Sequence, residues 1–295
     1  MSKQKRRLKT APLILVQLEI QWSQLPSPNV FTPEELSSFH KGMSALGLPD
    51  KETINDSYHQ IQIGHASPAL TETNIIRHIF SNGGSDCHVE ITRERLIIRQ
   101  ARYEGIEKLF DLTEKVLDHL NPIEDVSSSV IELISLHHVD IFIPKAGNSL
   151  ESYIKPKNLL SYRPNIDDSL SVKTTSSSVT LLEKSDERIR DISLRFNVLR
   201  FNQGKLSYLL PPELQEPNPL AVMRLHLPAV EDIDKDGEYG VMDIRHAVKF
   251  FTKPKFSDFD KLKQLDELYQ TSSDTFWKIL SDTALKEWEV EYYHV

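Results

Sequence analysis

The sequence predicts an α+β fold built from two similar modules, each a curved antiparallel sheet packed on a long helix. Strand-like runs alternate apolar and polar residues and are joined by short turns. Two long helical patterns, at 103–122 and 257–288, end the two halves of the chain. The order of strand, insertion, antiparallel meander and helix therefore recurs. We expect one module at 1–125 and a second at 126–295.

The first module opens on a strand at 16–22, where apolar and polar residues alternate behind a basic N-terminal tail at 3–9. Thr32 as N-cap, Pro33 at the first helical position and Glu35 three residues after the cap predict a helix with a capping box. The runs 57–65, 75–81 and 87–103 predict a meander with turns at 82–84 and near 93–94. An apolar stripe then predicts a helix that ends at Asn121-Pro122.

The second module starts on the long apolar run "SVIELISLHHVDIFIP" at 129–144, which predicts another strand. The Ser-, Thr-, Lys- and Pro-rich segment 144–180 is expected to be an irregular insertion. Strands are expected at 191–201, 205–211, 221–230 and 241–251, before the closing helical region. If the first strands of the two modules pair, the result is one continuous saddle.

The composition limits the function classes. The 295 residues carry a formal net charge of −8, which disfavours broad adhesion to nucleic acid. The single cysteine, Cys87, excludes an internal disulfide framework and is typical of a reducing compartment. The basic start lacks a small-residue cleavage site, and no other segment approaches the ~18 apolar residues of a membrane span. We therefore expect a cytoplasmic protein without a membrane partner.

Four stretches resemble a family of sporadically distributed, functionally uncharacterised bacterial proteins. They are "APLILVQLEIQW" at 11–22, the block 80–112 that begins "FSNGGSDCHVEIT", "VMDIRHA" at 241–247, and the closing run 265–288 that ends "TALKEW". The family shares a Pro-Leu opening strand, a strand–strand block with a Tyr before the helix, a late Asp-Ile strand, and closing Leu, Phe and Trp residues. Where the family carries an Arg-Tyr-Asn-rich strand, this chain has "SLHHVDIFIP".

The resemblance implies a bacterial protein without an established activity. Scattered families of this kind often travel with mobile or antiphage-defence genes, which favours an accessory or regulatory role. The predicted saddle is also similar in shape to a duplicated fold of the TATA-binding-protein type, or to a helix-grip duplication. A likeness of shape carries no function with it.

The stretch "EDIDKDGEYGVMD" at 231–243 has the ligand order of a calcium-binding loop. Asp232, Asp234, Asp236, Gly237 and Asp243 fill the required positions. An EF-hand needs a helix on each side, but both flanks alternate as strands. Asp243 is then expected to lie in a strand and not in the loop. The pattern favours a solvated acidic hairpin, with divalent-ion binding as the alternative.

The remaining chemistry-bearing residues form no known motif. His137 and His138 precede Asp140, but neighbours in a strand point to opposite faces, so at most one of the pair joins His226 or His246. No H-x-H, H-x-x-x-H, C-x-x-C, G-x-S-x-G or phosphate-binding loop occurs. The sequence therefore predicts no cofactor and does not favour catalysis of these classes.

Two sets of residues are candidates for binding. Arg93, Arg95, Arg99 and Arg102 cluster on the predicted meander, where a sheet face could contact a nucleic-acid backbone or could pair with acids instead. The C-terminal run "WEVEYYHV" offers three aromatic residues of the kind enriched in protein interfaces: Trp288, Tyr292 and Tyr293.

These observations favour a non-catalytic protein-binding component, acting as an accessory, regulatory or antitoxin-like part of a bacterial defence or mobile-element system. Its protein partner is expected to be encoded by a neighbouring gene. Nucleic-acid binding through the sheet and a metal-dependent enzyme that uses the acidic loop are the alternatives. Homodimer formation is left open.

Overall fold

The computed structural model describes residues 4–294 except 28, 63–68, 146, 156–173, 202–205, 207–208 and 228–236. These residues form an α+β fold with one large antiparallel sheet and few helices. The strands of the sheet are β2 (Leu13–Trp22), β3 (Asp50–Gln62), β4 (Ala69–Ser81), β5 (Cys87–Thr92), β6 (Arg95–Gln100), β7 (Ile131–Phe142), β8 (Thr174–Lys184), β9 (Arg188–Arg200) and β10 (Glu238–Phe250). The helices are α1 (Pro33–Ala45), α2 (Ile106–Leu120), α3 (Glu124–Ser128), α4 (Lys261–Ile279) and α5 (Asp282–Glu287).

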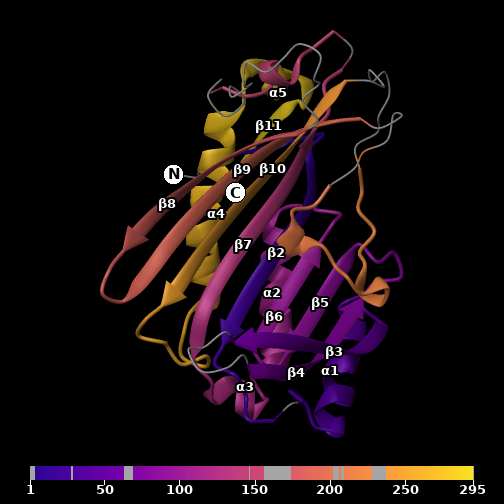
Figure 1. Ribbon diagram of the computed structural model, residues 1–295, viewed down its shortest axis with the longest axis vertical. Helices are drawn as coiled ribbons and strands as arrows, with labels where there is room; N and C mark the ends of the chain where they lie inside the picture. The colour runs from indigo at the N-terminus through magenta and orange to yellow at the C-terminus, as the bar shows by residue number, and fades with distance from the viewer. Residues whose placement is uncertain are drawn as a thin grey trace.

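The sheet is continuous through the centre of the molecule (Figure 1). Its strand order is β3-β4-β5-β6-β2-β7-β10-β9-β8. The first strands of the two halves, β2 and β7, pair antiparallel from Leu13↔Asp140 to Trp22↔Ile131, so the condition for one continuous sheet is met. In each half the strand that precedes the long helix, β6 or β10, lies directly beside the first strand.

Several elements follow from local sequence signals. The Thr32 side chain accepts a hydrogen bond from the Glu35 amide, and the Glu35 carboxylate accepts one from the Thr32 amide, which confirms the capping box of α1. The strands β5 and β6 are joined at Arg93-Glu94, the position that the sequence predicts for the turn. The helix α2 ends at Leu120, directly before Asn121-Pro122.

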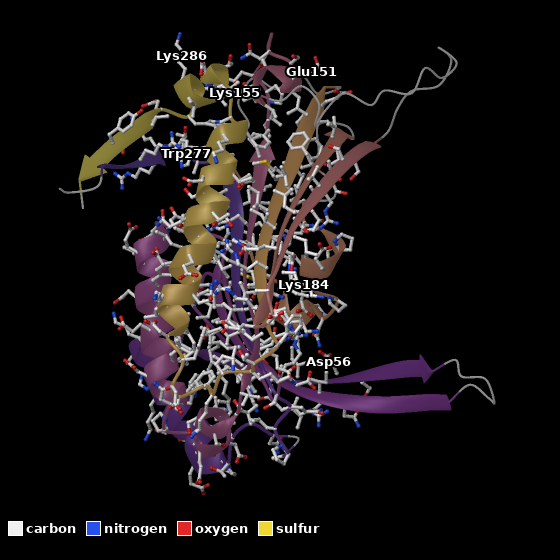
Figure 2. All side chains as sticks on the ribbon, turned by 90° about the vertical axis from the view of Figure 1, so that its left-hand side faces the viewer. Asp56, Glu151, Lys155, Lys184, Trp277 and Lys286 are labelled. Carbon is white, nitrogen blue, oxygen red and sulfur yellow. The ribbon has the colours of Figure 1, made fainter. Side chains whose placement is uncertain are left out.

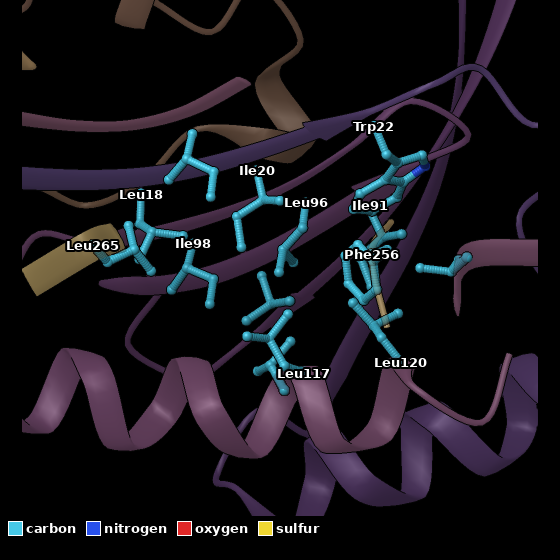
Figure 3. Close-up of a cluster of buried hydrophobic side chains, with 14 of the residues drawn as sticks. Leu18, Ile20, Trp22, Ile91, Leu96, Ile98, Leu117, Leu120, Phe256 and Leu265 are labelled. Atoms are coloured by element: carbon cyan, nitrogen blue, oxygen red, sulfur yellow. The ribbon is translucent and has the colours of Figure 1, made fainter. Parts of the chain in front are cut away.

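The long helices cover one face of the sheet (Figure 2). The largest core lies under them, where Leu18, Ile20 and Ile98 from the strands meet Leu117 of α2 and Leu265 of α4 (Figure 3). All five side chains are buried. Each contributes about 1.5–3 kcal/mol relative to an exposed position, which explains why the sheet and both helices form one unit.

The opposite face of the sheet is crossed by part of the long connection between β9 and β10. Residues 209–227, here named the strap, include the single turns Pro212–Leu214 and Pro219–Ala221. The strap runs as far as the β4–β5 turn, where the Arg224 amide donates to the Ser85 carbonyl at 2.8 Å. His226 Nε2 lies 2.9 Å from a carboxylate oxygen of Asp86. One connection between neighbouring strands therefore covers much of the first half of the sheet.

Two sequence-based expectations about elements are wrong, and one pair of strands was not predicted. Within the described residues, 205–211 and 221–230 contain no strand. Their apolar side chains alternate because they pack onto the sheet from the connection between β9 and β10. The segment expected to be irregular, 144–180, includes the start of β8 from Thr174, while its residues 146 and 156–173 lie outside the described residues. The N-terminal basic tail contains a strand, β1 (Gln4–Leu8), which pairs antiparallel with β11 (Val290–His294).

The predicted boundary between the modules, after residue 125, falls inside α3. The sheet itself crosses that boundary through the pairing of β2 with β7. Among the described residues, none of the helices combines the length and the apolar character that crossing a bilayer requires.

Candidate binding cleft between the two long helices

A cleft of about 520 Å³ opens on the helix side of the sheet. Its walls are the start of α2, the second half of α4 and the β1–β11 ribbon, and its floor is the end of β7. Figure 2 labels Trp277 where α4 meets this ribbon. The cleft therefore lies where the helices of the two halves and both ends of the chain come together.

The floor carries two ionisable side chains, His138 and Asp140. They are two residues apart in β7, so both point to the helix side of the sheet. The positions paired with Asp140 on the neighbouring strands are Leu13 and Met242, which are apolar and cannot compensate its charge. His138 pairs across the sheet with Ile244, which also lines the cleft.

Asp140 is held in its neutral form. Its side chain is nearly buried, with 3% of the residue surface exposed. Among the described residues, no group donates a hydrogen bond to its carboxyl group or forms an ion pair with it. Burial raises its pKa to about 8, so the carboxyl group keeps its proton at neutral pH.

His138 is also neutral. Burial, together with the neighbouring His137, lowers its pKa to about 3. Its ring lies against Tyr269 of α4, with 6.3 Å between ring centroids. At neutral pH the floor thus presents a carboxylic acid and an uncharged imidazole, which can each both donate and accept hydrogen bonds.

Aromatic side chains form much of the wall. Tyr103 stands before α2, while Tyr269, Phe276 and Trp277 come from α4. The Arg6 guanidinium of β1 lies over the Trp277 ring, 4.3 Å from the ring centroid. The wall of the cleft therefore already holds one cation that belongs to the chain itself.

The charges at the mouth largely neutralise one another. Arg7 lies 3.0 Å from Glu291 across the β1–β11 ribbon, and Lys9 lies 2.9 Å from Glu289. The helix α2 begins after Gly105, whose φ of 124° suits a glycine and which provides no side-chain cap. Among the described residues at the mouth, the positive charges of Arg7 and Lys9 thus face acids, and Arg6 stands apart from them.

The four candidate arginines do not form one surface. Arg93 lies in the β5–β6 turn beside Glu94, and Arg102 is exposed beyond the end of β6. Only Arg95 and Arg99 point to the face that the strap crosses. The cluster that the sequence shows is therefore divided in space.

Acids engage the two sheet-face arginines. Arg95 lies 3.6 Å from both Glu19 and Glu90. The Arg99 Nε donates to Gln17 at 2.6 Å, and its guanidinium lies 3.8 Å from Glu216 of the strap. This face is a network of paired charges and not an open basic surface.

Arg77 of β4 is the centre of that network. Its guanidinium binds three carboxylates: Asp56 at 2.8 Å, Glu90 at 2.7 Å and Glu216 at 2.6 Å. Glu216 also accepts a hydrogen bond from the Asn218 amide. The ion pairs therefore hold the strap against the sheet.

The candidate metal ligands are also separated. Asp232, Asp234 and Asp236 lie outside the described residues. Asp243 lies in β10, as the sequence predicts, and its carboxylate binds His137 at 3.2 Å and Arg195 at 2.7 Å. Over the ranges that the structure describes, no three His, Cys, Asp or Glu residues are placed to hold a metal ion.

The remaining histidines and the cysteine are engaged elsewhere. His226 lies beside Asp86, and His246 bonds the Leu268 carbonyl at 3.0 Å. Burial raises the pKa of the Cys87 thiol to about 11, so the thiol is protonated at neutral pH. A thiol in that state is a poor nucleophile.

The candidate aromatic residues at the C-terminus are also divided. Trp288 packs into the protein's own core, with ring centroids 5.2 Å from Phe142 and 5.8 Å from Tyr153. Tyr292 lies on β11 with 65% of its surface exposed. Tyr293 pairs through its backbone with Lys5, and its side chain lies outside the described residues.

No protein-family model matches this sequence, and no curated protein matches it either. Sequence reasoning considered His138 and Asp140 only as metal ligands, and it missed the aromatic wall. The spacing of two within a strand was the available signal for the floor. Most aromatic residues of the wall come from α4, more than a hundred residues later in the chain.

Proposed function

We propose that this chain is a non-catalytic binding protein whose interhelical cleft takes an organic cation, an ammonium or guanidinium group. The observation that supports this most directly is Asp140, which is buried, faces the cleft and has no partner among the described residues. A buried carboxyl group without a partner either keeps its proton or awaits a positive charge. A cation in the cleft ionises it and forms a charge-assisted pair.

The wall supports the same class of ligand. Aromatic rings attract cations through the negative faces of their π systems. Arg6 on Trp277 is an example of this contact within the cleft itself. An anion has less support, because the other cations at the mouth already face acids and Asp140 repels an anion whenever it is ionised.

The expected source of the cation is a Lys or Arg side chain of a partner protein. This keeps the sequence-based hypothesis of a protein-binding accessory, regulatory or antitoxin-like component. A bacterial origin, a role in defence or in a mobile element, and a partner encoded nearby stay predictions, which the flanking genes and pull-down of their products test. No observation favours the nucleic-acid or the metal-enzyme alternative, since acids occupy Arg95 and Arg99 and most of the acidic loop is outside the described residues.

Calorimetric titration tests the proposal. The full chain is titrated with N-acetylargininamide, and with N-acetylcitrullinamide as an uncharged control of nearly equal shape. We expect the charged compound to bind with release of a proton, and its affinity to rise about tenfold per pH unit below pH 8 as Asp140 ionises. Asp140→Asn is expected to weaken binding at least tenfold. Equal binding of both compounds, or an Asp140→Asn variant that binds normally, contradicts the proposal.

A second arm separates the possible sources. Butylguanidinium and butylammonium represent free amines, and an acetylated Gly-Arg-Gly amide represents a basic side chain on a protein. Tighter binding of the peptide supports a protein partner, whereas tighter binding of the small cations identifies a free amine as the ligand. If none of them binds at millimolar concentration, the cleft is not a cation site.

We also propose that the two halves are related by duplication, in the manner of a TATA-binding-protein or helix-grip arrangement. The strand order supports this, because β6 beside β2 corresponds to β10 beside β7. An experimentally determined structure in which residues 1–125 and 126–295 are superposed tests the relation. Halves that share no common strand path contradict it.

A further inference from the structure

The two edges of the sheet differ in protection. Among the described residues, the outer strands of the sheet are β3 and β8, each with a neighbouring strand on one side only. Such edges attract other strands, and proteins usually block them with charged residues, proline or bulges. Over 50–56, β3 carries four charged residues: Asp50, Lys51, Glu52 and Asp56. By contrast, residues 174–182 of β8 read "TTSSSVTLL", with no charge, proline or glycine.

The unprotected edge also exposes apolar side chains. Val179 is 47% exposed and Leu181 is 62% exposed. On the neighbouring strand β9 they pair with Leu194 and Ile192, which pack against the core under α4. Val179 and Leu181 therefore continue the helix-side apolar surface outward to the edge of the sheet, where it ends without cover from the described residues.

We propose that β8 pairs antiparallel with β8 of a second copy of this chain, around a two-fold axis at Thr180. The sheets of the two copies then join edge to edge (Figure 1 shows β8 as an outer strand). Strand addition of this kind uses main-chain hydrogen bonds for affinity and alternate side chains for specificity. The interface is self-complementary, as a two-fold contact must be.

The side chains explain the choice of axis. An axis at Thr180 places Val179 opposite Leu181 of the second copy, and Leu181 opposite its Val179. Directly opposed side chains in an antiparallel pair lie about 5 Å apart, so these four form one apolar cluster across the axis. Glu183 and Lys184 fall opposite Ser177 and Ser176, which brings no like charges together.

A second copy fits this edge better than an unrelated strand. Each copy contributes the same two side chains, Val179 and Leu181, to the proposed cluster. The contact is therefore complete with residues that this chain already carries. The proposal is independent of the cleft, which lies on the far side of α4 from β8 and uses different residues.

The experiment measures the mass of the full chain in solution by sedimentation at increasing concentration. The wild type is expected to form dimers with a dissociation constant on the order of micromolar. Val179→Lys with Leu181→Lys places lysine opposite lysine and is expected to weaken the dimer at least tenfold. Val179→Lys with Leu181→Glu places lysine opposite glutamate at the same two positions, and is expected to restore it.

The matched control is Asn55→Lys on the other edge, which is expected to leave the mass unchanged. Thermal unfolding of each variant shows whether it is folded. A wild type that stays monomeric at high concentration overturns the proposal, even if the edge then captures a strand of another protein. A dimer that is equally stable in the variant with two lysines and in the variant with lysine at 179 and glutamate at 181 overturns it as well.

Discussion

Two buried aspartates on adjacent central strands behave in opposite ways. Asp140 of β7 points to the helix side, and Asp243 of β10 points to the side that the strap crosses. Their exposures are 3% and 2%, so burial does not distinguish them. Burial would raise the pKa of Asp243, but hydrogen bonds from His137 and Arg195 lower it below its ordinary value. Burial acts alone on Asp140 and raises its pKa to about 8.

The difference shows that partners, and not depth, decide what a buried acid does. Asp243 has its positive partner within the fold, so it ties β10 to β9 and β7 and has little left to offer a ligand. Asp140 has no such partner among the described residues, and the space beside it is a cleft. The unpaired acid reduces stability and is therefore the better candidate for function.

The largest expected effect comes from breaking the paired acid. Asp243→Asn removes the negative charge that Arg195 and His137 bind, and we expect the free energy of unfolding to fall by about 3 kcal/mol. Urea unfolding at pH 7 measures it. Asp191→Asn on the same face is the control, because its pair with Arg245 is more exposed and contributes less than about 1 kcal/mol. Equal losses in the two variants would show that Asp243 is no more important than a surface acid.

The unpaired acid is expected to respond in the opposite direction. Because its folded-state pKa is raised, the contribution of Asp140 to stability is full below pH 3.8 and is lost as the pH rises toward 8. Asp140→Asn removes this loss, so the variant is expected to match the wild type near pH 4 and to exceed it by about 2 kcal/mol or more at pH 8.

Urea midpoints of both proteins between pH 4 and 8 measure that difference. The buried imidazoles of His78 and His88, with pKa values of about 4, titrate in both proteins and cancel in the comparison. A gap between the proteins that does not widen with pH would mean that Asp140 is already ionised in the fold. The cleft would then need a different explanation.

Much of the fold could be predicted because its signals are local. The capping box at Thr32, the turn at Arg93-Glu94 and the end of α2 depend on neighbouring residues. The errors share one cause, which is that contacts with distant segments of the chain override the local pattern. Residues 222–227 alternate like a strand, but the alternation arises because the strap packs one side onto the sheet. The serines of β8 look like loop residues, yet β9 supplies their hydrogen-bonding partner.

The candidate site was less predictable than the fold. The sequence places Asp140 in an apolar strand, but it does not show that Leu13 and Met242 flank it, or that Arg195 serves the other aspartate. The four arginines at 93–102 are close in sequence but divided in space, because Arg93 falls in a turn and Arg102 lies beyond the strand. Partner choice is a long-range property, and it decides which charged residues are free.

The smallest expected effect concerns Arg6, the arginine at the wall of the cleft. Arg195 binds Asp243 directly, whereas Arg6 lies over Trp277 at the wall of the cleft and makes no bond to Asp140. If a ligand cation uses the same ring, Arg6 competes with it. An exposed cation–π contact is worth about 0.5–1 kcal/mol, so Arg6→Gln is expected to tighten N-acetylargininamide binding about two- to fivefold.

Titration calorimetry of the Arg6→Gln variant at pH 8 measures this gain, with Arg7→Gln as the control because Arg7 faces Glu291 across the ribbon. The sign of the change is more informative than its size. If Arg6 belonged to an anion site, its loss would weaken binding of a small carboxylate and leave the cation unaffected. A gain confined to Arg6→Gln instead means that the chain's own guanidinium occupies the position that a ligand cation takes. That position lies in the cleft beside Asp140, which has no cationic partner among the described residues.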